Sequence, residues 1–300
     1  MDIFMTGASG YIGGTIALRL QRDGHRLRGL VRGADKAARL AAIGIEPVIG
    51  SLDDGALLIA EARRADAVIN TADSDHRGAV EALLAGLGGS NKPLLHTSGS
   101  SIVADDACGA HASDKIYDED TPLDPVPDKR ARVAIDTLVR SGAARGVRAA
   151  VICNTLIYGT GRGLARDSAQ VPTLVAEARR SGVVRHVGRG LNIWSNVHVD
   201  DVAELYALAL VKAVPGGFYF VENGEASFRD IAAAIARRLG MAAPQDWPVD
   251  DAIARLGKGR AVYSLGSNSR VRGRRSRADL GWQPRGIALI PWIEGEMATT

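Results

Sequence analysis

The chain has 300 residues, of which 46% are apolar and 24% are charged, and its formal net charge is +3. This composition is ordinary for a globular protein, and the length allows one large domain with an appendage or two modest domains. No apolar run approaches the eighteen or so residues that a membrane span needs, so we expect no membrane partner. The two cysteines, Cys108 and Cys153, are too few for a disulfide framework and favour a reducing cytoplasm.

In the first half of the chain, short β-branched runs alternate with amphipathic helical segments. The predicted strands are residues 3–5, 27–31, 45–49, 67–70, 94–97 and 147–152. The predicted helices are residues 11–22, 34–42, 54–64, 78–86 and 129–144. This alternation predicts an α/β fold with a Rossmann-type, doubly wound parallel sheet and helices on both faces. Residues 1–153 are expected to form its dinucleotide-binding core.

The alternation ends at about residue 154. Gly159, Gly161 and Gly163 predict a flexible loop, and a helix follows it. After this, strands are predicted at 183–187 and 217–221, and helices at 200–212 and 228–239. Asp200 is expected to be the N-cap of the first of these helices, and Asp201 an acid in its first turn. No linker separates these elements from the first half. Residues 154–300 are therefore expected to complete the core and to form a small C-terminal α/β substrate lobe, without becoming a tethered domain.

The first predicted strand continues into Thr6-Gly-Ala-Ser-Gly-Tyr-Ile-Gly13. Gly7 allows a sharp turn, Gly10 lets the backbone approach a pyrophosphate, and Gly13 lets the helix pack closely on the strand. The N-terminus of the helix then presents free N–H groups and a positive dipole end to the phosphates. Because the glycines stand between a strand and an amphipathic helix, they predict a dinucleotide-binding loop.

The residue at the end of the second strand indicates which dinucleotide binds. An acidic residue there suits the ribose hydroxyls of NAD, whereas an arginine suits the 2′-phosphate of NADP. Arg32 occupies this place, so we expect NADP, with NAD as the alternative. Arg28 is a competing candidate, Lys36 offers a further positive charge, and Asp35 is expected to be the N-cap of helix 34–42.

Five segments resemble, in order, the motifs of the extended short-chain dehydrogenase/reductases, which include nucleotide-sugar epimerases and dehydratases. The glycine loop resembles the TGxxGxxG fingerprint, and the others are LLHTSGS at 94–100, LIYG at 156–159, VHVDDVA at 197–203 and LGWQP at 280–284. The resemblance implies a cofactor site made from the glycine loop and the ends of later strands. The cofactor-binding residues expected there are Gly7, Ser9, Gly10, Tyr11, Ile12, Gly13, Arg32, Leu52, Thr71, Ala72, Thr97 and Asn154.

Catalysis in this family rests on a Tyr-x-x-x-Lys pair, in which the lysine and the cofactor lower the pKa of the tyrosine. None of the six tyrosines has a lysine four residues later. Asp128 and Arg132 occupy the expected tyrosine and lysine positions. The chain thus resembles the atypical extended members, in which the catalytic residues are degraded while cofactor binding persists. Some of those carry an aspartate in the loop after the fourth strand, where Asp73 and Asp75 lie here.

Four residues are candidates for a non-standard catalytic set, and each has a structural alternative. Ser98 or Ser100 is expected to hydrogen-bond a substrate carbonyl. Alternatively, each serine only ends a strand. A strict alignment with the family places Gly99, between them, at the position of the catalytic serine. Arg132 keeps a positive charge where the family lysine touches the nicotinamide ribose, but it cannot deprotonate. Tyr158 is the best-placed spare phenol, or else a wall of the pocket. The histidines show no metal-ligand spacing, so we predict no metal.

These features predict an NADP(H)-dependent oxidoreductase that acts on a small carbonyl or alcohol. The alternatives are an epimerase or dehydratase with transient cofactor reduction, and a non-catalytic NADP(H)-binding sensor. Trp194 stands where relatives that bind nucleotide sugars carry a basic residue, which favours a smaller, more apolar substrate unless Trp194 belongs to the core.

Two surface features bear on macromolecular partners. The arginines at 270, 272, 274, 275 and 277 are expected to form a solvated face, so we predict no nucleic-acid partner. The apolar stripe on helix 129–144 either makes a homodimer contact or faces the sheet. Its residues are Val133, Ile135, Leu138 and Val139.

Overall fold

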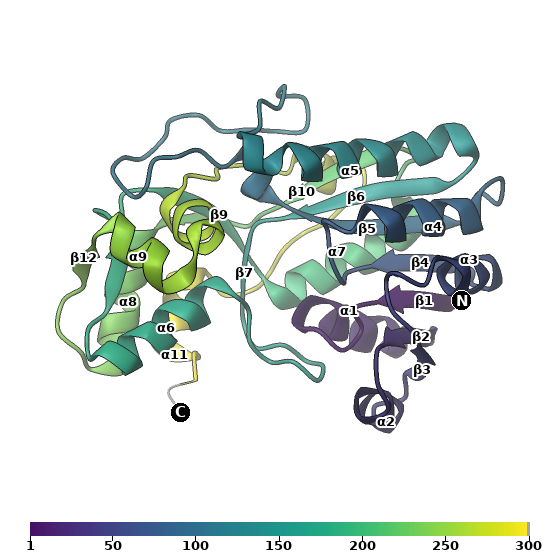
Figure 1. Ribbon diagram of the computed structural model, residues 1–300, viewed down its shortest axis with the longest axis horizontal. Helices are drawn as coiled ribbons and strands as arrows, with labels where there is room; N and C mark the ends of the chain where they lie inside the picture. The colour runs from purple at the N-terminus through teal and green to yellow at the C-terminus, as the bar shows by residue number, and fades with distance from the viewer. Residues whose placement is uncertain (299–300) are drawn as a thin grey trace.

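A computed structural model describes residues 1–298 of the chain. Its central sheet has seven parallel strands in the order β3-β2-β1-β4-β5-β6-β10 (Figure 1). The strands are β1 (Asp2–Thr6), β2 (Arg26–Val31), β3 (Glu46–Ile49), β4 (Ala67–Asn70), β5 (Pro93–Gly99), β6 (Arg148–Asn154) and β10 (Gly217–Val221). The strand order reverses between β1 and β4, which leaves a crevice at their carboxyl ends. The predicted Rossmann-type fold is therefore confirmed.

Helices cover both faces of this sheet. On one face pack α1 (Tyr11–Arg22), α2 (Ala34–Ala42) and α7 (Val199–Lys212). On the other pack α3 (Gly55–Arg64), α4 (Arg77–Leu87) and α5 (Arg130–Ser141). Ile3 and Met5 of β1 belong to the first apolar layer and Phe4 to the second, because successive strand side chains point to opposite faces. Both layers are buried, so the sheet is a rigid support for the loops at its carboxyl edge.

The chain after residue 154 contributes α7 and β10 to the central sheet and builds a lobe beyond its carboxyl edge (Figure 1). The lobe helices are α6 (Gln170–Ser181), α8 (Phe228–Leu239), α9 (Val249–Leu256) and α11 (Leu289–Gly295). Its strands are β7 (Leu156–Tyr158), β8 (Arg185–Val187), β9 (Ile193–His198), β11 (Glu225–Ser227) and β12 (Gln245–Trp247). The lobe also contains the π-helix η4 (Gly259–Gly266). The remaining short elements are η1 (Ser100–Val103), η2 (Pro127–Lys129), η3 (Gly142–Arg145) and α10 (Arg274–Ala278).

A segment near the C-terminus, residues 267–271, joins the lobe to the sheet. The Ser269 hydroxyl lies 2.8 Å from both the carbonyl oxygen and the hydroxyl of Ser100, just after β5. Ser269 also bridges Trp194 of β9, and the amide of Val271 donates to the Ser195 hydroxyl at 2.9 Å. This segment therefore fixes the position of the lobe over the carboxyl edge of the sheet.

Two predicted helix caps are wrong. Gly33, in an extended conformation, is the N-cap of α2, and Asp35 lies inside the first turn. His198 is the N-cap of α7, and its Nδ1 accepts the amide of Asp200 at 3.2 Å. Each helix begins before the predicted acid, so the carboxylates of Asp35 and Asp200 instead interact with the positive end of the helix dipole.

The arginine cluster at 270–277 and the apolar stripe on α5 both make contacts within the chain. Arg270 and Arg272 pair with Glu225, and the other arginines of the cluster pair with Asp118, Asp120 and Glu222. On α5, Ile135 and Val139 are buried against the sheet. Val133 and Leu138 pack against the same layer. Across residues 1–298, none of the helices is both long and apolar enough to cross a membrane.

Candidate cofactor and catalytic site

The glycine loop has the geometry of an anion cradle. Gly7 has a φ of 73°, and a Cβ built there would lie 2.7 Å from the carbonyl carbon of Thr71. A Cβ on Gly13 would lie 2.3 Å from the carbonyl oxygen of Gly7, so neither position accepts a larger residue without movement. Gly10 is the N-cap of α1 and provides no side-chain cap. The first-turn N–H groups of α1 are thus left for a ligand, as a pyrophosphate site requires.

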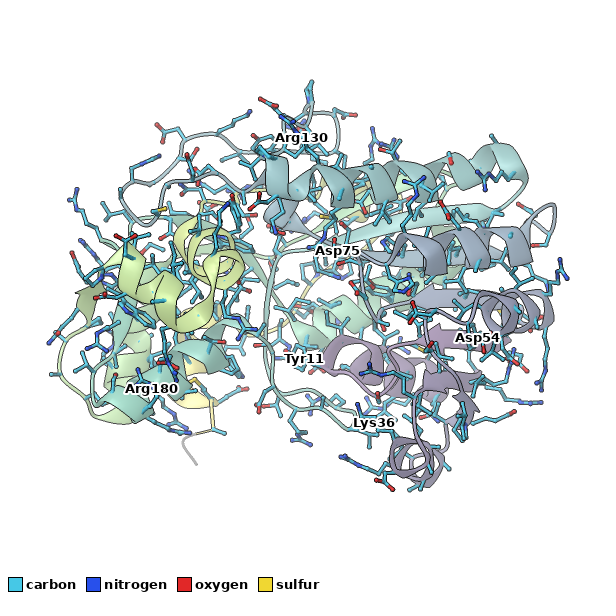
Figure 2. All side chains as sticks on the ribbon, viewed as in Figure 1. Tyr11, Lys36, Asp54, Asp75, Arg130 and Arg180 are labelled. Atoms are coloured by element: carbon cyan, nitrogen blue, oxygen red, sulfur yellow. The ribbon has the colours of Figure 1, made fainter. Side chains whose placement is uncertain are left out.

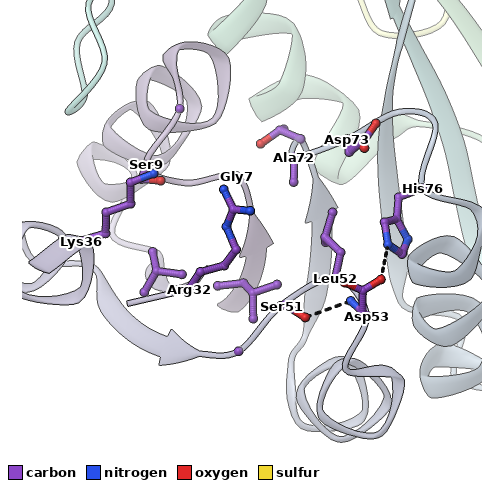
Figure 3. Close-up of a pocket in the computed structure, with 15 residues that line it drawn as sticks. Gly7, Ser9, Arg32, Lys36, Ser51, Leu52, Asp53, Ala72, Asp73 and His76 are labelled. Atoms are coloured by element: carbon purple, nitrogen blue, oxygen red, sulfur yellow. Dashed lines mark hydrogen bonds and ion pairs between the residues drawn. The ribbon is translucent and has the colours of Figure 1, made fainter. Parts of the chain in front are cut away.

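Two cavities, each of about 430 Å³, lie on either side of this loop and share Gly10, Thr71 and Ala72. Both have the size of small-molecule sites. The first extends over the ends of β2 and β3 (Figure 3). The second extends toward the loop that precedes α6. The predicted cofactor residues that line them are Gly7, Ser9, Gly10, Tyr11, Ile12, Gly13, Arg32, Leu52, Thr71 and Ala72.

The two remaining predicted cofactor residues lie at the ends of β5 and β6 and line neither cavity. The Thr97 hydroxyl is 2.6 Å from the hydroxyl of Tyr206 on α7, and Asn154 Nδ2 donates to the same oxygen at 3.5 Å. The Oδ1 atom of Asn154 is buried without a hydrogen-bond partner in the described chain. An unpaired buried carbonyl oxygen is costly, so this atom fits a donor group on a bound ligand.

The structure separates the two arginines that competed for the cofactor. Arg28 is fully buried, with its Nε 2.8 Å from Asp2 Oδ1 and its guanidinium paired with Glu61. Arg32 is exposed beyond the end of β2, and with Lys36 it lines the first cavity (Figure 3). Both side chains point toward the glycine loop. Arg32 is therefore the arginine available to a ligand.

The hydroxyl groups proposed for catalysis are engaged in internal hydrogen bonds. Ser98 is buried and donates to Asp136 Oδ2 at 2.8 Å, and Ser100 is buried against Ser269. The Tyr158 hydroxyl donates to the carbonyl oxygen of Ile287 at 2.7 Å, within the core of the lobe. Burial and the nearby Asp201 raise the pKa of Tyr158. None of the three side chains lines either cavity, and this geometry favours the structural alternative for each.

Arg132, in contrast, belongs to a polar cluster at the carboxyl edge of the sheet. Its Nε donates to Asp75 Oδ1 at 2.8 Å, its Nη2 donates to the other oxygen, and its Nη1 lies 3.4 Å from the Ser101 hydroxyl. These bonds lower the pKa of Asp75. A Cβ on Gly99 would lie 3.6 Å from Arg132 Nη1, so the guanidinium stands beside the family's serine position. Figure 2 shows Asp75 and Tyr11 on the side of the sheet that faces the lobe.

A row of buried polar side chains, each close to the next, lies beneath this cluster. The Thr6 hydroxyl donates to Asn70 Oδ1 at 2.5 Å, and Asn70 Nδ2 lies 3.0 Å from His96 Nδ1. His96 Nε2 then faces Asp136 Oδ1 at 4.0 Å, and neither atom has a closer partner in the described chain. Burial lowers the pKa of His96 to about 4 and raises that of Asp136 to about 7. His96 is therefore neutral near pH 7, whereas Asp136 is in the middle of its titration there.

Several side chains at this site escaped the sequence analysis. Asp167, Ser168 and Gln170 line the second cavity, and Gln170 Nε2 donates to the Ser264 carbonyl oxygen in η4 at 3.0 Å. Ser101 contacts Arg132, and no motif pointed to it.

Trp194 belongs to the core of the lobe, where its Nε1 donates to the Ser267 carbonyl oxygen at 2.7 Å.

Comparison with known proteins agrees with this architecture. The model of a family described as "NAD dependent epimerase/dehydratase family" matches residues 3–221. The chain belongs to this family. As a member, it is 34% identical to Oxidase ucsJ of Acremonium sp over 97% of the chain and 95% of that protein.

Two further comparisons, one of sequence and one of fold, add to this result. The chain is 26% identical to the 4-hydroxy-2-methyl-3-oxo-4-farnesyl-3,4-dihydroquinoline-1-oxide ketoreductase of Stigmatella aurantiaca, over 75% of the chain and 69% of that protein. The fold matches the dTDP-glucose 4,6-dehydratase DesIV of Streptomyces venezuelae, solved with NAD and TYD bound, with a TM-score of 0.77. That match has 19% identity and covers 99% of this chain and 98% of the other. The chain is thus similar in sequence to proteins named as an oxidase and a ketoreductase, and similar in fold to a protein named as a dehydratase.

Proposed function

We propose that this protein is an NADP(H)-dependent oxidoreductase that interconverts a small carbonyl compound and its alcohol. The positive charge at the end of β2 supports the proposal most directly. Arg32 and Lys36 both line the first cavity, and the sequence Val31-Arg32-Gly33 places no carboxylate where NAD sites hold the ribose hydroxyls. The relatives named as an oxidase and a ketoreductase support the same class of reaction.

The residues of the two cavities fit a dinucleotide that extends across the glycine loop. Arg32 and Lys36 would hold the 2′-phosphate, the first turn of α1 would hold the pyrophosphate, and the nicotinamide would extend toward Asn154. A bound nicotinamide supplies a hydride to the substrate carbonyl carbon. Arg132, held by Asp75 at the carboxyl edge of the sheet, would bring a positive charge to the nicotinamide end of the site. That charge would stabilise negative charge that develops on the carbonyl oxygen.

Calorimetric titration of NADPH and NADH tests the cofactor assignment. We expect NADPH to bind more tightly, and Arg32→Ala to weaken NADPH about tenfold to hundredfold while changing NADH less than threefold. A charge-assisted hydrogen bond contributes about 1.5–3 kcal/mol, and each tenfold in affinity is about 1.4 kcal/mol. Arg39→Ala is the matched control, because Arg39 is exposed on α2, the helix that follows Arg32, but does not line the cavity. Equal losses for both cofactors, or tighter NADH binding, would contradict the assignment.

The reaction itself is tested by NADPH oxidation with a panel of ketones, aldehydes and oxo acids. Net consumption of NADPH with at least one of them is the expected result. Cofactor that stays bound through purification with no net consumption would instead indicate epimerase or dehydratase chemistry. NADPH binding without turnover of any kind would indicate a sensor.

A further inference from the structure

Reduction of a carbonyl requires a proton donor as well as a hydride, and this inference rests on the proposed oxidoreductase function. The chain lacks the family tyrosine, because Asp128 stands in its place. The Asp128 carboxylate is engaged by Lys258 Nζ at 2.9 Å, and this contact lowers the pKa of Asp128. Asp128 is therefore ionised near neutral pH and has no proton to give.

Other acidic groups near this edge of the sheet are also unsuitable. Asp136 holds a proton below pH 7, but its side chain is buried and accepts the Ser98 hydroxyl. Tyr11 lines the second cavity, but its hydroxyl donates to the Gly159 carbonyl oxygen at 2.9 Å, and burial and the charge of Asp200 raise its pKa. His96 is buried and its pKa of about 4 leaves it without a second proton at neutral pH. Arg132 does not release its proton in any ordinary protein environment.

Lys129 is the residue directly after Asp128, at the end of η2, and its side chain is half-buried. Its Nζ lies 5.3 Å from the centre of the Tyr263 ring, which η4 of the lobe supplies. Lys129 lines neither cavity, but it interacts electrostatically with Asp75 and Arg132, so it lies close to the polar cluster described above. Within residues 1–298, its Nζ forms no hydrogen bond and no ion pair with a carboxylate.

Lys258 provides a contrast on the same ring. Its Nζ lies 5.4 Å from the centre of the Tyr263 ring, but its side chain is 59% exposed and paired with Asp128. The Asp128 contact raises the pKa of Lys258. For Lys129 the direction is opposite, because burial and the positive charge of Arg132 lower its pKa. An ammonium group with a lowered pKa gives up a proton more readily near neutral pH.

We propose that Lys129 is the general acid of the reaction. As the hydride forms the new C–H bond, the π electron pair of the carbonyl moves to oxygen. The oxygen takes a proton from Lys129 Nζ, so that an O–H bond forms, an N–H bond breaks and a neutral amine remains. Water then returns a proton to the amine. In the alcohol-oxidising direction the neutral amine accepts the hydroxyl proton.

Three variants test this assignment with NADPH and a carbonyl compound that the wild type reduces. We expect Lys129→Met to lower kcat about 100- to 10,000-fold, the range of general acid catalysis, with NADPH affinity within threefold of wild type. Lys129→Arg should not restore kcat, because a guanidinium keeps its proton. Lys258→Met, the matched control, should stay within twofold. In the wild type, kcat should fall as the pH rises through the pKa of Lys129, and Lys129→Met should lose this dependence.

Other outcomes overturn the assignment in distinguishable ways. Unchanged kcat and pH profile in Lys129→Met, or full activity in Lys129→Arg, would remove Lys129 as the acid. A higher KM with unchanged kcat would make Lys129 a substrate-binding residue instead. Loss of the alkaline limb in Tyr11→Phe, with Lys129→Met still active, would identify Tyr11 as the donor. A wild-type protein that reduces no carbonyl in the panel would refute the proposed function and this inference together.

Discussion

The buried His96–Asp136 contact makes two opposite contributions to the pH dependence of stability. Burial lowers the pKa of His96 from 6.5 to about 4, so the unfolded chain binds a proton that the folded chain does not. The stability contributed by His96 is therefore present above pH 6.5 and lost as the pH falls toward 4. Burial raises the pKa of Asp136 from 3.8 to about 7. Its contribution is present below pH 3.8 and lost as the pH rises toward 7.

Because each pKa unit corresponds to about 1.4 kcal/mol, each contribution changes the free energy of unfolding by about 3–4 kcal/mol across its window. The two windows overlap almost completely, so in the wild type the contributions largely cancel. Replacing one residue of the pair should leave the pH-dependent contribution of the other residue unopposed. Relative to wild type, Asp136→Asn should gain stability as the pH rises from about 4 to 7, and His96→Gln should lose stability as the pH rises from 4 to 6.5.

Urea unfolding at four pH values between 4 and 7 measures these slopes. All other titratable groups are common to the three proteins. The difference in the free energy of unfolding between a variant and wild type therefore isolates the contribution of the replaced residue. Opposite slopes of about 1 kcal/mol per pH unit are expected for the two variants. Curves that run parallel to the wild type, or two variants with slopes of the same sign, would refute the reasoning.

Two further substitutions test the packing that supports the site. Gly13→Ala places a Cβ 2.3 Å from the Gly7 carbonyl oxygen. It should therefore lower the free energy of unfolding by about 1–3 kcal/mol and weaken NADPH binding at least tenfold. Gly55→Ala is the control, because its Cβ meets nothing closer than 4.0 Å, and it should change neither the thermal melt nor the NADPH titration. Arg28→Met leaves the Glu61 carboxylate buried without its partner and should cost about 3–5 kcal/mol in urea unfolding. Arg26→Met, at an arginine that is 70% exposed, should change stability by less than about 1 kcal/mol, and similar values for both arginines would contradict the assignment of the buried pair.

The fold and the cofactor loop could be predicted because their signals are local in sequence. The glycines at 7, 10 and 13 belong to one turn, and the strand and helix periods need only ten or so residues to be recognised. The choice between Arg28 and Arg32 could not be made in this way. Both side chains have the same strand parity, and only the contacts of Arg28 with Asp2 and Glu61 distinguish them.

The roles of the candidate catalytic residues were harder to predict, because the partners of these side chains come from distant segments. The Ser98 hydroxyl bonds to Asp136, 38 positions away, and Ser100 to Ser269, 169 positions away. A serine at the end of a strand looks the same in sequence whether or not such a partner exists. The proposed role of Lys129 had no sequence signal for a similar reason, since the Tyr263 ring beside it belongs to the lobe.

The 267–271 segment also has a consequence for the order in which the molecule assembles. The contact between Ser100 and Ser269 closes a loop of 169 residues, and closure of a long loop costs entropy before its contacts form. The glycine loop needs only β1, β4 and α1, all within the first 70 residues. During synthesis, dinucleotide-binding geometry can therefore form early, whereas the opposite wall of the cleft waits for nearly the whole chain to emerge.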